Sequence, residues 1–506
     1  MKLRFLLLFA LVPVANLPAQ ITLPRILASH MVVQRDLPVH VWGTATPGEA
    51  VNIEFRGESR STKANPLGRW SLYLKPGSAG GPFQMKIQGT PSAPVADAAP
   101  SVAQTITLDD VLVGDVWVAS GQSNMEFAMS GASTATQDLP HAANDHIRLL
   151  IVKTRAIEYP QDDVDTDGWK ASSPETAKDF SAVAWYFARD IERREHVPVG
   201  VIDSTWGGTV AEAWTRMTAL GQDAALAPLF VSWGKMTEHE TDVAFEQRDE
   251  QRQRDEAKAQ GKPEPQFPWH PQLKSWGPGL IYNGMIAPLT PFPIRGVIWY
   301  QGESNSALER APLYKRIFST MISDWRQQWG VGDFPFLYVQ ISNFKSGPGE
   351  NWAVLRQQQL KTLEVANTAM AVTIDIGNPD NVHPTNKLDV GLRLALAARA
   401  LSYGEDISYS GPIFRQATPE GGAIRVWFSH HAKGLVAKGG DPTSFEVAGA
   451  DGRFMPATAK IDGNTVVASS PDVPEPVYVR YGWANSPQCN LFNGEGLPAS
   501  PFTSAQ

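Results

Sequence analysis

The run Val-Leu-Val-Gly-Asp-Val-Trp-Val-Ala at residues 111–119, with Gly-Gln-Ser-Asn-Met at 121–125, decides how this sequence is expected to fold. The first run is mostly apolar, which is typical of a strand buried on both faces of a parallel sheet. Ser123 comes directly after the predicted strand end. Because open α/β sheets bind ligands at the carboxyl ends of their strands, Ser123 is a candidate nucleophile. A plain helix N-cap is the alternative role for a serine here.

Similar apolar runs recur farther along the chain and alternate with helical patterns. Apolar residues repeat at helical spacing over 180–191 and 314–325. Alternating strands and helices predict an α/β domain over residues 109–404, with a parallel sheet covered on both faces. Residues 235–262 are rich in charge and predict a solvated surface helix inserted in a loop. The further predicted strands are 199–202, 296–300, 334–341 and 369–376.

The two ends of the chain predict β structure instead. Residues 20–108 contain short alternating runs separated by turn formers, which indicates an N-terminal β-sandwich-like domain. Residues 405–506 return to short strands, and Asp451-Gly452 and Asp462-Gly463 are typical hairpin turns. We therefore expect a C-terminal β module. A chain of 506 residues is long enough for two or three domains.

The N-terminal residues 1–19 are predicted to be a signal peptide. Lys2 and Arg4 precede an apolar core, and Leu17-Pro18-Ala19 is an acceptable cleavage site. We therefore expect export to the periplasm or the cell exterior. No later apolar run is long enough to span a bilayer, so no membrane anchor is expected. The only cysteine, Cys489, excludes an intramolecular disulfide.

The charge of the chain argues against nucleic acid as a partner. The formal net charge is −8, and no basic run reverses it locally. The sequence leaves the oligomeric state open.

A candidate acid–base pair follows the last predicted strand. In Asp380-Asn381-Val382-His383, a separation of three lets one turn bring the carboxylate to the imidazole. Asp380 would then fix the tautomer of His383 and leave Nε2 facing Ser123. The alternative is loop polarity before a helix that starts near Pro384.

Candidate oxyanion donors follow the second and third strands. Trp206-Gly207-Gly208-Thr209 offers a backbone N–H from Gly207 or Gly208, beside that of Ser123. The segment 301–305, Gln-Gly-Glu-Ser-Asn, offers a side-chain amide from Gln301, with Asn305 as the alternative. Any one segment alone is compatible with an ordinary loop. Together, four polar segments after strand ends of one sheet predict a serine esterase that works through an acyl-enzyme.

These blocks resemble the SGNH (GDSL-like) hydrolase superfamily, and within it the sialate O-acetylesterase group of carbohydrate esterases. The resemblance covers nearly the whole mature chain. It implies a flavodoxin-like three-layer fold, no metal or other cofactor, and deacetylation of an O-acetylated carbohydrate. It also makes Gln122, Asn124, Glu303 and Asn305 candidate substrate-binding residues. The similar segments are 31–36, 121–125, 206–209, 282–286, 299–305, 380–383, 433–436 and 497–502.

The sequence departs from the broad superfamily at two positions. Gln122 stands where aspartate is common, and the third block lacks a simple Gly-X-Asn-Asp. By this resemblance, Gln301 takes the place of the asparagine of that block. The sugar is also left open, between O-acetyl sialic acid and acetylated xylan or another hemicellulose. A sialic acid site should hold an arginine for the substrate carboxylate.

Three other classes fit the sequence less well. An α/β-hydrolase needs Gly-X-Ser-X-Gly, and Met125 stands in the last place. A metal-dependent deacetylase needs clustered ligands, but His430 and His431 are neighbours in a β-like run and should point to opposite faces. A non-catalytic carbohydrate-binding protein is compatible with the 16 tryptophans. A binding protein of this kind would leave Ser123, Asp380 and His383 without a role.

Overall fold

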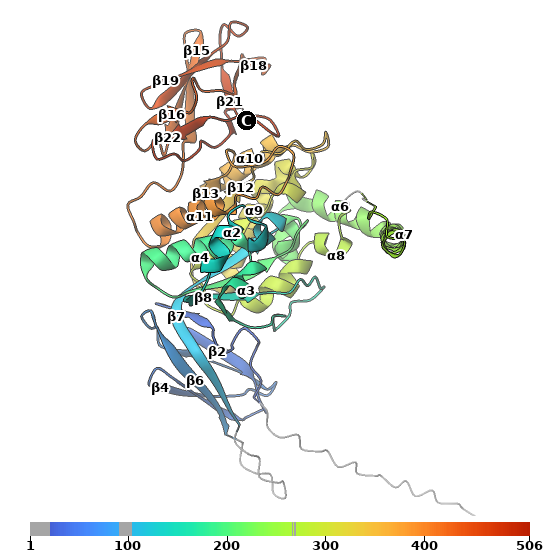
Figure 1. Cartoon of the computed structure of the whole chain (residues 1–506), viewed down its shortest axis with the longest axis vertical. Coiled ribbons are helices and arrows are strands. Elements are labelled where there is room, and N and C mark those ends of the chain that lie inside the picture. The colour runs from blue at the N-terminus through green and yellow to red at the C-terminus, as the bar shows by residue number, and fades with distance from the viewer. Residues whose placement is uncertain (1–20, 91–103, 266, 268–269, 506) are drawn as a thin grey trace, which may run out of the picture.

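The computed structural model describes residues 21–90, 104–265, 267 and 270–505 (Figure 1). The predicted signal peptide, residues 1–19, lies outside the described residues. A central α/β body lies between an N-terminal β region and a C-terminal β region, which sit at opposite ends of the molecule (Figure 1).

The central body is organised by parallel strands. All five apolar runs predicted from the sequence are strands, and β8 joins them in parallel beside β10. The strand order is β13-β12-β11-β7-β10-β8-β9, with β9 antiparallel at the edge. The strands are β7 (Thr105–Gly121), β8 (Asn144–Ile151), β9 (Lys170–Ser172), β10 (Val199–Thr205), β11 (Gly296–Tyr300), β12 (Phe336–Gln340) and β13 (Thr368–Val372).

Helices cover both faces of this sheet. The Trp117 ring of β7 packs against Phe187 of α4 (Ala182–Glu195), with 5.0 Å between ring centroids. Ser120, three residues farther along β7, faces the other side and is in register with Trp299. Trp299 packs against α9 (Tyr314–Trp329). Therefore α4 and α9 lie on opposite faces. The helix α11 (Lys387–Ser402) packs beside α4, and α10 (Trp352–Lys361) lies on the α9 face.

The N-terminal β region continues into the central sheet through β7, which contradicts a simple domain boundary at residue 108. The first part of β7 pairs with β6, and its second part pairs with β10 and β11. One uninterrupted strand therefore belongs to both regions, and no turn separates them. The other strands are β1 (Val32–Gln34), β2 (Val39–Thr44), β3 (Ala50–Phe55), β4 (Glu58–Lys63), β5 (Arg69–Leu74) and β6 (Gly80–Thr90).

The C-terminal β region packs against the central body through α10. The Gln357 side chain accepts a hydrogen bond from the Thr503 N–H at 3.1 Å. Gln340 at the end of β12 donates to the Ser500 hydroxyl at 2.9 Å. The strands are β14 (Ile413–Glu420), β15 (Ala423–Ser429), β16 (Leu435–Ala437), β17 (Phe445–Ala448), β18 (Phe454–Pro456), β19 (Thr458–Asp462), β20 (Thr465–Ser469), β21 (Tyr478–Tyr481), β22 (Leu491–Asn493) and β23 (Phe502–Thr503).

The charged segment 235–262, predicted as one surface helix, contains the whole of α7 (Glu240–Ala259) and the end of α6 (Ala227–Glu238). In Figure 1 the helix α7 lies beside the central body, and most of its described side chains are exposed. Within the described ranges, no helix is long and apolar enough to cross a membrane. The remaining α-helices are α1 (Ser123–Glu126), α2 (Ala135–Asp138), α3 (Pro174–Lys178), α5 (Met217–Leu220), α6 (Ala227–Glu238), α7 (Glu240–Ala259) and α8 (Leu273–Trp276).

Candidate active site

Ser123 and His383 meet at the carboxyl edge of the central sheet. The His383 Nε2 atom lies 2.8 Å from the Ser123 Oγ atom, although the residues are 260 positions apart. Ser123 begins α1 directly after β7, and His383 lies in the loop between β13 and α11. Both side chains are half-buried. This distance allows His383 to take the hydroxyl proton, so the predicted nucleophile and base are brought together.

The chain turns sharply before the nucleophile. Gly121 has a φ of +135°, and an added Cβ would lie 2.2 Å from the Tyr300 carbonyl oxygen. Only glycine fits this close approach of β7 to β11. The turn therefore fixes where Ser123 leaves the sheet.

The loop that carries His383 is tied to the helix that carries Ser123. The His383 N–H donates to the Asn381 Oδ1 atom at 2.9 Å. The Asn124 amide donates to the Val382 carbonyl at 3.0 Å. These bonds hold the base and the nucleophile in one arrangement, which favours proton transfer between them.

The environment of His383 favours its neutral form. Burial lowers the pKa of the imidazole, and the nearby charge of Lys387 lowers it further. A neutral imidazole can accept a proton, so the same shift keeps His383 competent as a base in mildly acidic solution.

Asp380 does not make the contact predicted for it. Its Oδ1 atom accepts a hydrogen bond from Lys345 Nζ at 3.0 Å, and its side chain is 79% exposed. Among the described residues, no hydrogen bond joins Asp380 to His383. Lys345, in the loop after β12, binds the exposed Asp380 carboxylate in place of the His383 imidazole.

Gly207 lies beside the nucleophile, as the sequence predicts for an oxyanion donor. A Cβ added to Gly207 would lie 3.3 Å from the Ser123 Cβ atom. The Gly207 N–H donates to the Glu126 Oε2 atom at 2.7 Å. The Gly208 carbonyl accepts a hydrogen bond from the Trp276 indole at 2.7 Å, which anchors the loop. The Gly207 N–H therefore binds a carboxylate oxygen, that of Glu126, in this structure.

The predicted side-chain donors, Gln301 and Asn305, are not free to act. Both are completely buried. The Gln301 amide donates to the Asn305 Oδ1 atom at 2.7 Å and to the Thr209 carbonyl at 3.1 Å. The Asn305 amide donates to Glu212 at 2.8 Å. Their hydrogen bonds join the loops after β10 and β11, so both amides are engaged within the protein, and a third oxyanion donor from this segment stays a prediction.

The predicted substrate contacts Gln122, Asn124 and Glu303 are also internal. The Gln122 Oε1 atom accepts from the Ser304 N–H at 3.2 Å. The Asn124 amide donates to Glu303 Oε1 at 2.6 Å, and its oxygen accepts from the Lys387 ammonium. Like Gln301 and Asn305, these buried side chains join the segments around Ser123 to one another. The prediction that they bind the sugar is therefore not supported by their positions.

Lys387 and Glu303 place two ionisable groups in this buried network. Burial lowers the pKa of Lys387 to about 7, with an opposing effect of Glu303. Burial raises the pKa of Glu303, and its Oε2 atom has no hydrogen-bond partner among the residues that the structure describes. The Lys387 ammonium also lies over the Phe127 and Tyr300 rings.

Sequence reasoning missed Glu126, Lys345 and Lys387. Glu126 directly follows the serine block at 121–125, and Lys387 is the first residue of a helix with many apolar residues. These signals could have marked two of them. Lys345 has no comparable local signal, because only the fold brings it to Asp380.

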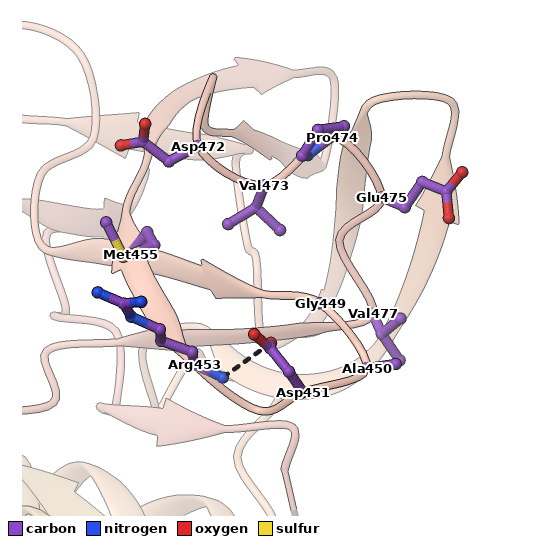
Figure 2. Close-up of a pocket in the computed structure, with 10 residues that line it drawn as sticks. All are labelled: Gly449, Ala450, Asp451, Arg453, Met455, Asp472, Val473, Pro474, Glu475 and Val477. Atoms are coloured by element: carbon purple, nitrogen blue, oxygen red, sulfur yellow. Dashed lines mark hydrogen bonds between the residues drawn. The ribbon is translucent and has the colours of Figure 1, made fainter.

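Two other features lie outside this site. A pocket of about 870 Å³ in the C-terminal β region is lined by the segments 449–455 and 472–477 (Figure 2). Figure 2 shows Asp451 accepting a hydrogen bond from the Arg453 N–H at 3.1 Å. The lining of this pocket contains none of the predicted site residues. The part of the chain that the structure describes has no cluster of three or more His, Cys, Asp or Glu side chains suited to a metal ion.

A serine hydroxyl within hydrogen-bond distance of an imidazole, at the carboxyl edge of a parallel sheet, is the arrangement found in serine hydrolases. Comparison with known proteins narrows that class. The family described as "Carbohydrate esterase, sialic acid-specific acetylesterase" matches residues 270–402. Sialate O-acetylesterase of Mus musculus is 29% identical and covers 94% of this chain and 92% of its own. The Homo sapiens sialate O-acetylesterase is 29% identical, with 93% and 90% covered.

A solved structure gives a stronger likeness over the whole molecule. A carbohydrate acetylesterase from Xanthomonas citri is 39% identical, with a TM-score of 0.82, and the match covers 96% of this chain and 100% of that one. The chain therefore belongs to the carbohydrate acetylesterase family. It is a carboxylic ester hydrolase.

Proposed function

We propose that Ser123 and His383 hydrolyse O-acetyl esters of carbohydrates through an acetyl-enzyme. The single observation that carries this proposal is the 2.8 Å distance between His383 Nε2 and Ser123 Oγ. His383 takes the hydroxyl proton as Ser123 Oγ bonds to the acetyl carbon. The bond from that carbon to the sugar oxygen then breaks, and the sugar leaves with the proton from His383.

Water completes the cycle. It attacks the acetyl carbon while His383 takes its proton, the bond to Ser123 Oγ breaks, and the proton returns to Ser123. The products are acetate and the free sugar hydroxyl. No redox step is needed, and the two residues account for every proton transfer.

The oxyanion of each tetrahedral intermediate would bind the backbone N–H groups of Ser123 and Gly207. The support for Gly207 is its neighbour, because a Glu126 carboxylate oxygen already lies 2.7 Å from its nitrogen. This is the distance at which such donors bind an oxyanion. The acetyl oxygen would replace Glu126 on this donor.

Asp380 would turn from Lys345 to the His383 Nδ1 atom during the reaction. The support is its sequence position three residues before His383 and its exposure. An ion pair between two exposed side chains typically contributes about 0–1 kcal/mol, so little is lost when it breaks.

The strand order supports a flavodoxin-like arrangement of the central body. The order β10-β7-β11-β12-β13 corresponds to 2-1-3-4-5 if β8 and β9 are edge additions. We also propose export to the periplasm or cell exterior, on the strength of the signal-like residues 1–19.

Substitution of the nucleophile and base tests the mechanism. We expect Ser123→Ala and His383→Ala each to lower kcat/KM for 4-nitrophenyl acetate by on the order of 10⁴-fold or more. Ser130→Ala and His141→Ala, at exposed positions in nearby segments, serve as matched controls. Circular dichroism and Tm report whether each variant folds. A folded Ser123→Ala enzyme with near-normal turnover would overturn the proposal.

A further inference from the structure

Glu126 stands beside the nucleophile without a role in the proton transfers. It is exposed, and its Oε2 atom accepts from the Gly207 N–H. A Cβ on Gly207 would lie 2.8 Å from this oxygen and 3.3 Å from the Ser123 Cβ atom. The carboxylate therefore lies against the short segment that borders Ser123.

The Glu126 carboxylate forms no ion pair with the residues that the structure describes. Within the described part of the chain, no Lys, Arg or His nitrogen lies within 4.0 Å of its carboxylate. Although Glu126 is exposed, the surrounding protein excludes enough water to raise its pKa, against the opposing effect of the Gly207 N–H. Behind it, burial raises the pKa of Asp203 to about 7, and Glu126 adds to that rise.

The cations of the site are already engaged elsewhere. Lys345 pairs with Asp380, and the buried Lys387 donates to Asn124. The side of Ser123 next to Gly207 therefore presents negative charge to an incoming ester. Like charges a few ångströms apart repel strongly in a partly desolvated site.

We propose that Glu126 is a specificity-determining residue that selects acetyl esters of neutral sugars over those of sugars that carry a carboxylate. The inference rests on the proposed function. When the acetyl oxygen takes the Gly207 N–H, Glu126 loses its donor. A hydroxyl of a neutral sugar replaces that hydrogen bond, because hydroxyls donate to carboxylates. The ionised carboxylate of a sialic acid cannot donate and is repelled.

The test compares three substrates at low ionic strength. These are 4-nitrophenyl acetate, an acetylated xylo-oligosaccharide and 9-O-acetylated sialic acid. The readout is the ratio of kcat/KM for the xylo-oligosaccharide to kcat/KM for the sialic acid. We expect this selectivity ratio to exceed about ten in the wild type, and Glu126→Gln to lower it by about tenfold. Salt at 0.3 M should weaken the effect of the substitution, because it screens exposed charges.

Two further variants separate charge from shape. Glu126→Asp keeps the charge and should keep most of the selectivity. Glu54→Gln, which removes an exposed charge in the N-terminal β region, should leave the ratio unchanged. The proposal is overturned if Glu126→Gln and the wild type have ratios within twofold of one another. It is also overturned if Glu126→Gln abolishes hydrolysis of 4-nitrophenyl acetate, because Glu126 would then act in the chemistry itself.

The two proposals fail in distinguishable ways. Loss of the proposed function would appear as a wild type that hydrolyses none of the three esters, or as an active Ser123→Ala variant. If the wild type is active, Ser123→Ala is inactive and the ratio does not respond to Glu126→Gln, only the specificity role of Glu126 is rejected.

Discussion

Lys345 donates a hydrogen bond to Asp380, with 3.0 Å between Nζ and Oδ1, although the two residues follow different strands of the central sheet. This ion pair holds the Asp380 carboxylate away from the role that its spacing from His383 predicts. The two side chains are 67% and 79% exposed, so the pair is easily separated by solvent. The activity of the site should therefore respond differently to the loss of each partner.

Asp380→Asn should lower kcat/KM for 4-nitrophenyl acetate by about 10²- to 10⁴-fold, because an asparagine stabilises the wrong imidazole tautomer. Lys345→Ala should retain at least wild-type activity, since it frees the carboxylate to turn to His383. Steady-state kinetics of both variants check the pair of outcomes. Wild-type activity in the Asp380→Asn enzyme would mean that His383 works without this aspartate.

The pH profile should report the lowered pKa of His383. Because the imidazole acts as a base when neutral, kcat/KM should rise with pH through a value below about 6.5, the ordinary histidine pKa. Lys387, with its pKa lowered to about 7, is largely charged where His383 titrates. Lys387→Gln removes that charge, so the acid limb should move to higher pH.

A matched control for this shift is Lys460→Gln, an exposed lysine of the C-terminal β region. It should leave the profile in place. If the acid limb of Lys387→Gln coincides with that of the wild type while the variant remains folded, Lys387 does not control the base.

The main effect that we expect of Gln301→Ala is a lower free energy of unfolding. The Gln301 side chain is completely buried and bonded to Thr209, Asn305 and Tyr314. Leaving such partners unsatisfied typically costs about 1–3 kcal/mol, which urea unfolding can measure. Tyr314→Phe removes the hydroxyl that bonds the Gln301 side chain, the Gln301 carbonyl and the Trp299 indole, but it leaves both bonds donated by the Gln301 amide, so we expect a smaller loss. A fully stable Gln301→Ala enzyme with kcat reduced by about 10²–10³ would restore Gln301 as an oxyanion donor.

Strong chelators should leave the rate unchanged. The proposed steps need only the Ser123 hydroxyl and the His383 imidazole, and neither depends on a metal-bound water. Dialysis against EDTA, followed by assay with 4-nitrophenyl acetate, checks this. Activity that is lost on dialysis and restored by Zn²⁺ would contradict it.

The strands around the site, and the segments that reach it, could be predicted from the amino-acid sequence. The apolar runs before Ser123, Trp206 and Gln301 form adjacent parallel strands, because such runs are stable only when both faces are covered. The ends of parallel strands share one edge of the sheet, so the segments after them meet there. The proximity of Ser123 and His383 could therefore be predicted before the structure was known.

Which side chains face Ser123 and His383, and where the β regions join the central body, depends on contacts that form only in the folded chain. Asn124 and Glu303 are hydrogen-bonded across 179 positions, and no local pattern specifies such a contact. The same holds for the burial of Gln301 and for the pairing of Asp380 with Lys345. The continuity of β7 through residue 108 could not be predicted either, because one strand can belong to two sheet regions without a break in its sequence pattern. The spacing of apolar residues along a helix or strand follows from backbone geometry, so it can be read from the sequence. The orientation of a side chain in a loop depends on contact partners that come close only when the chain folds.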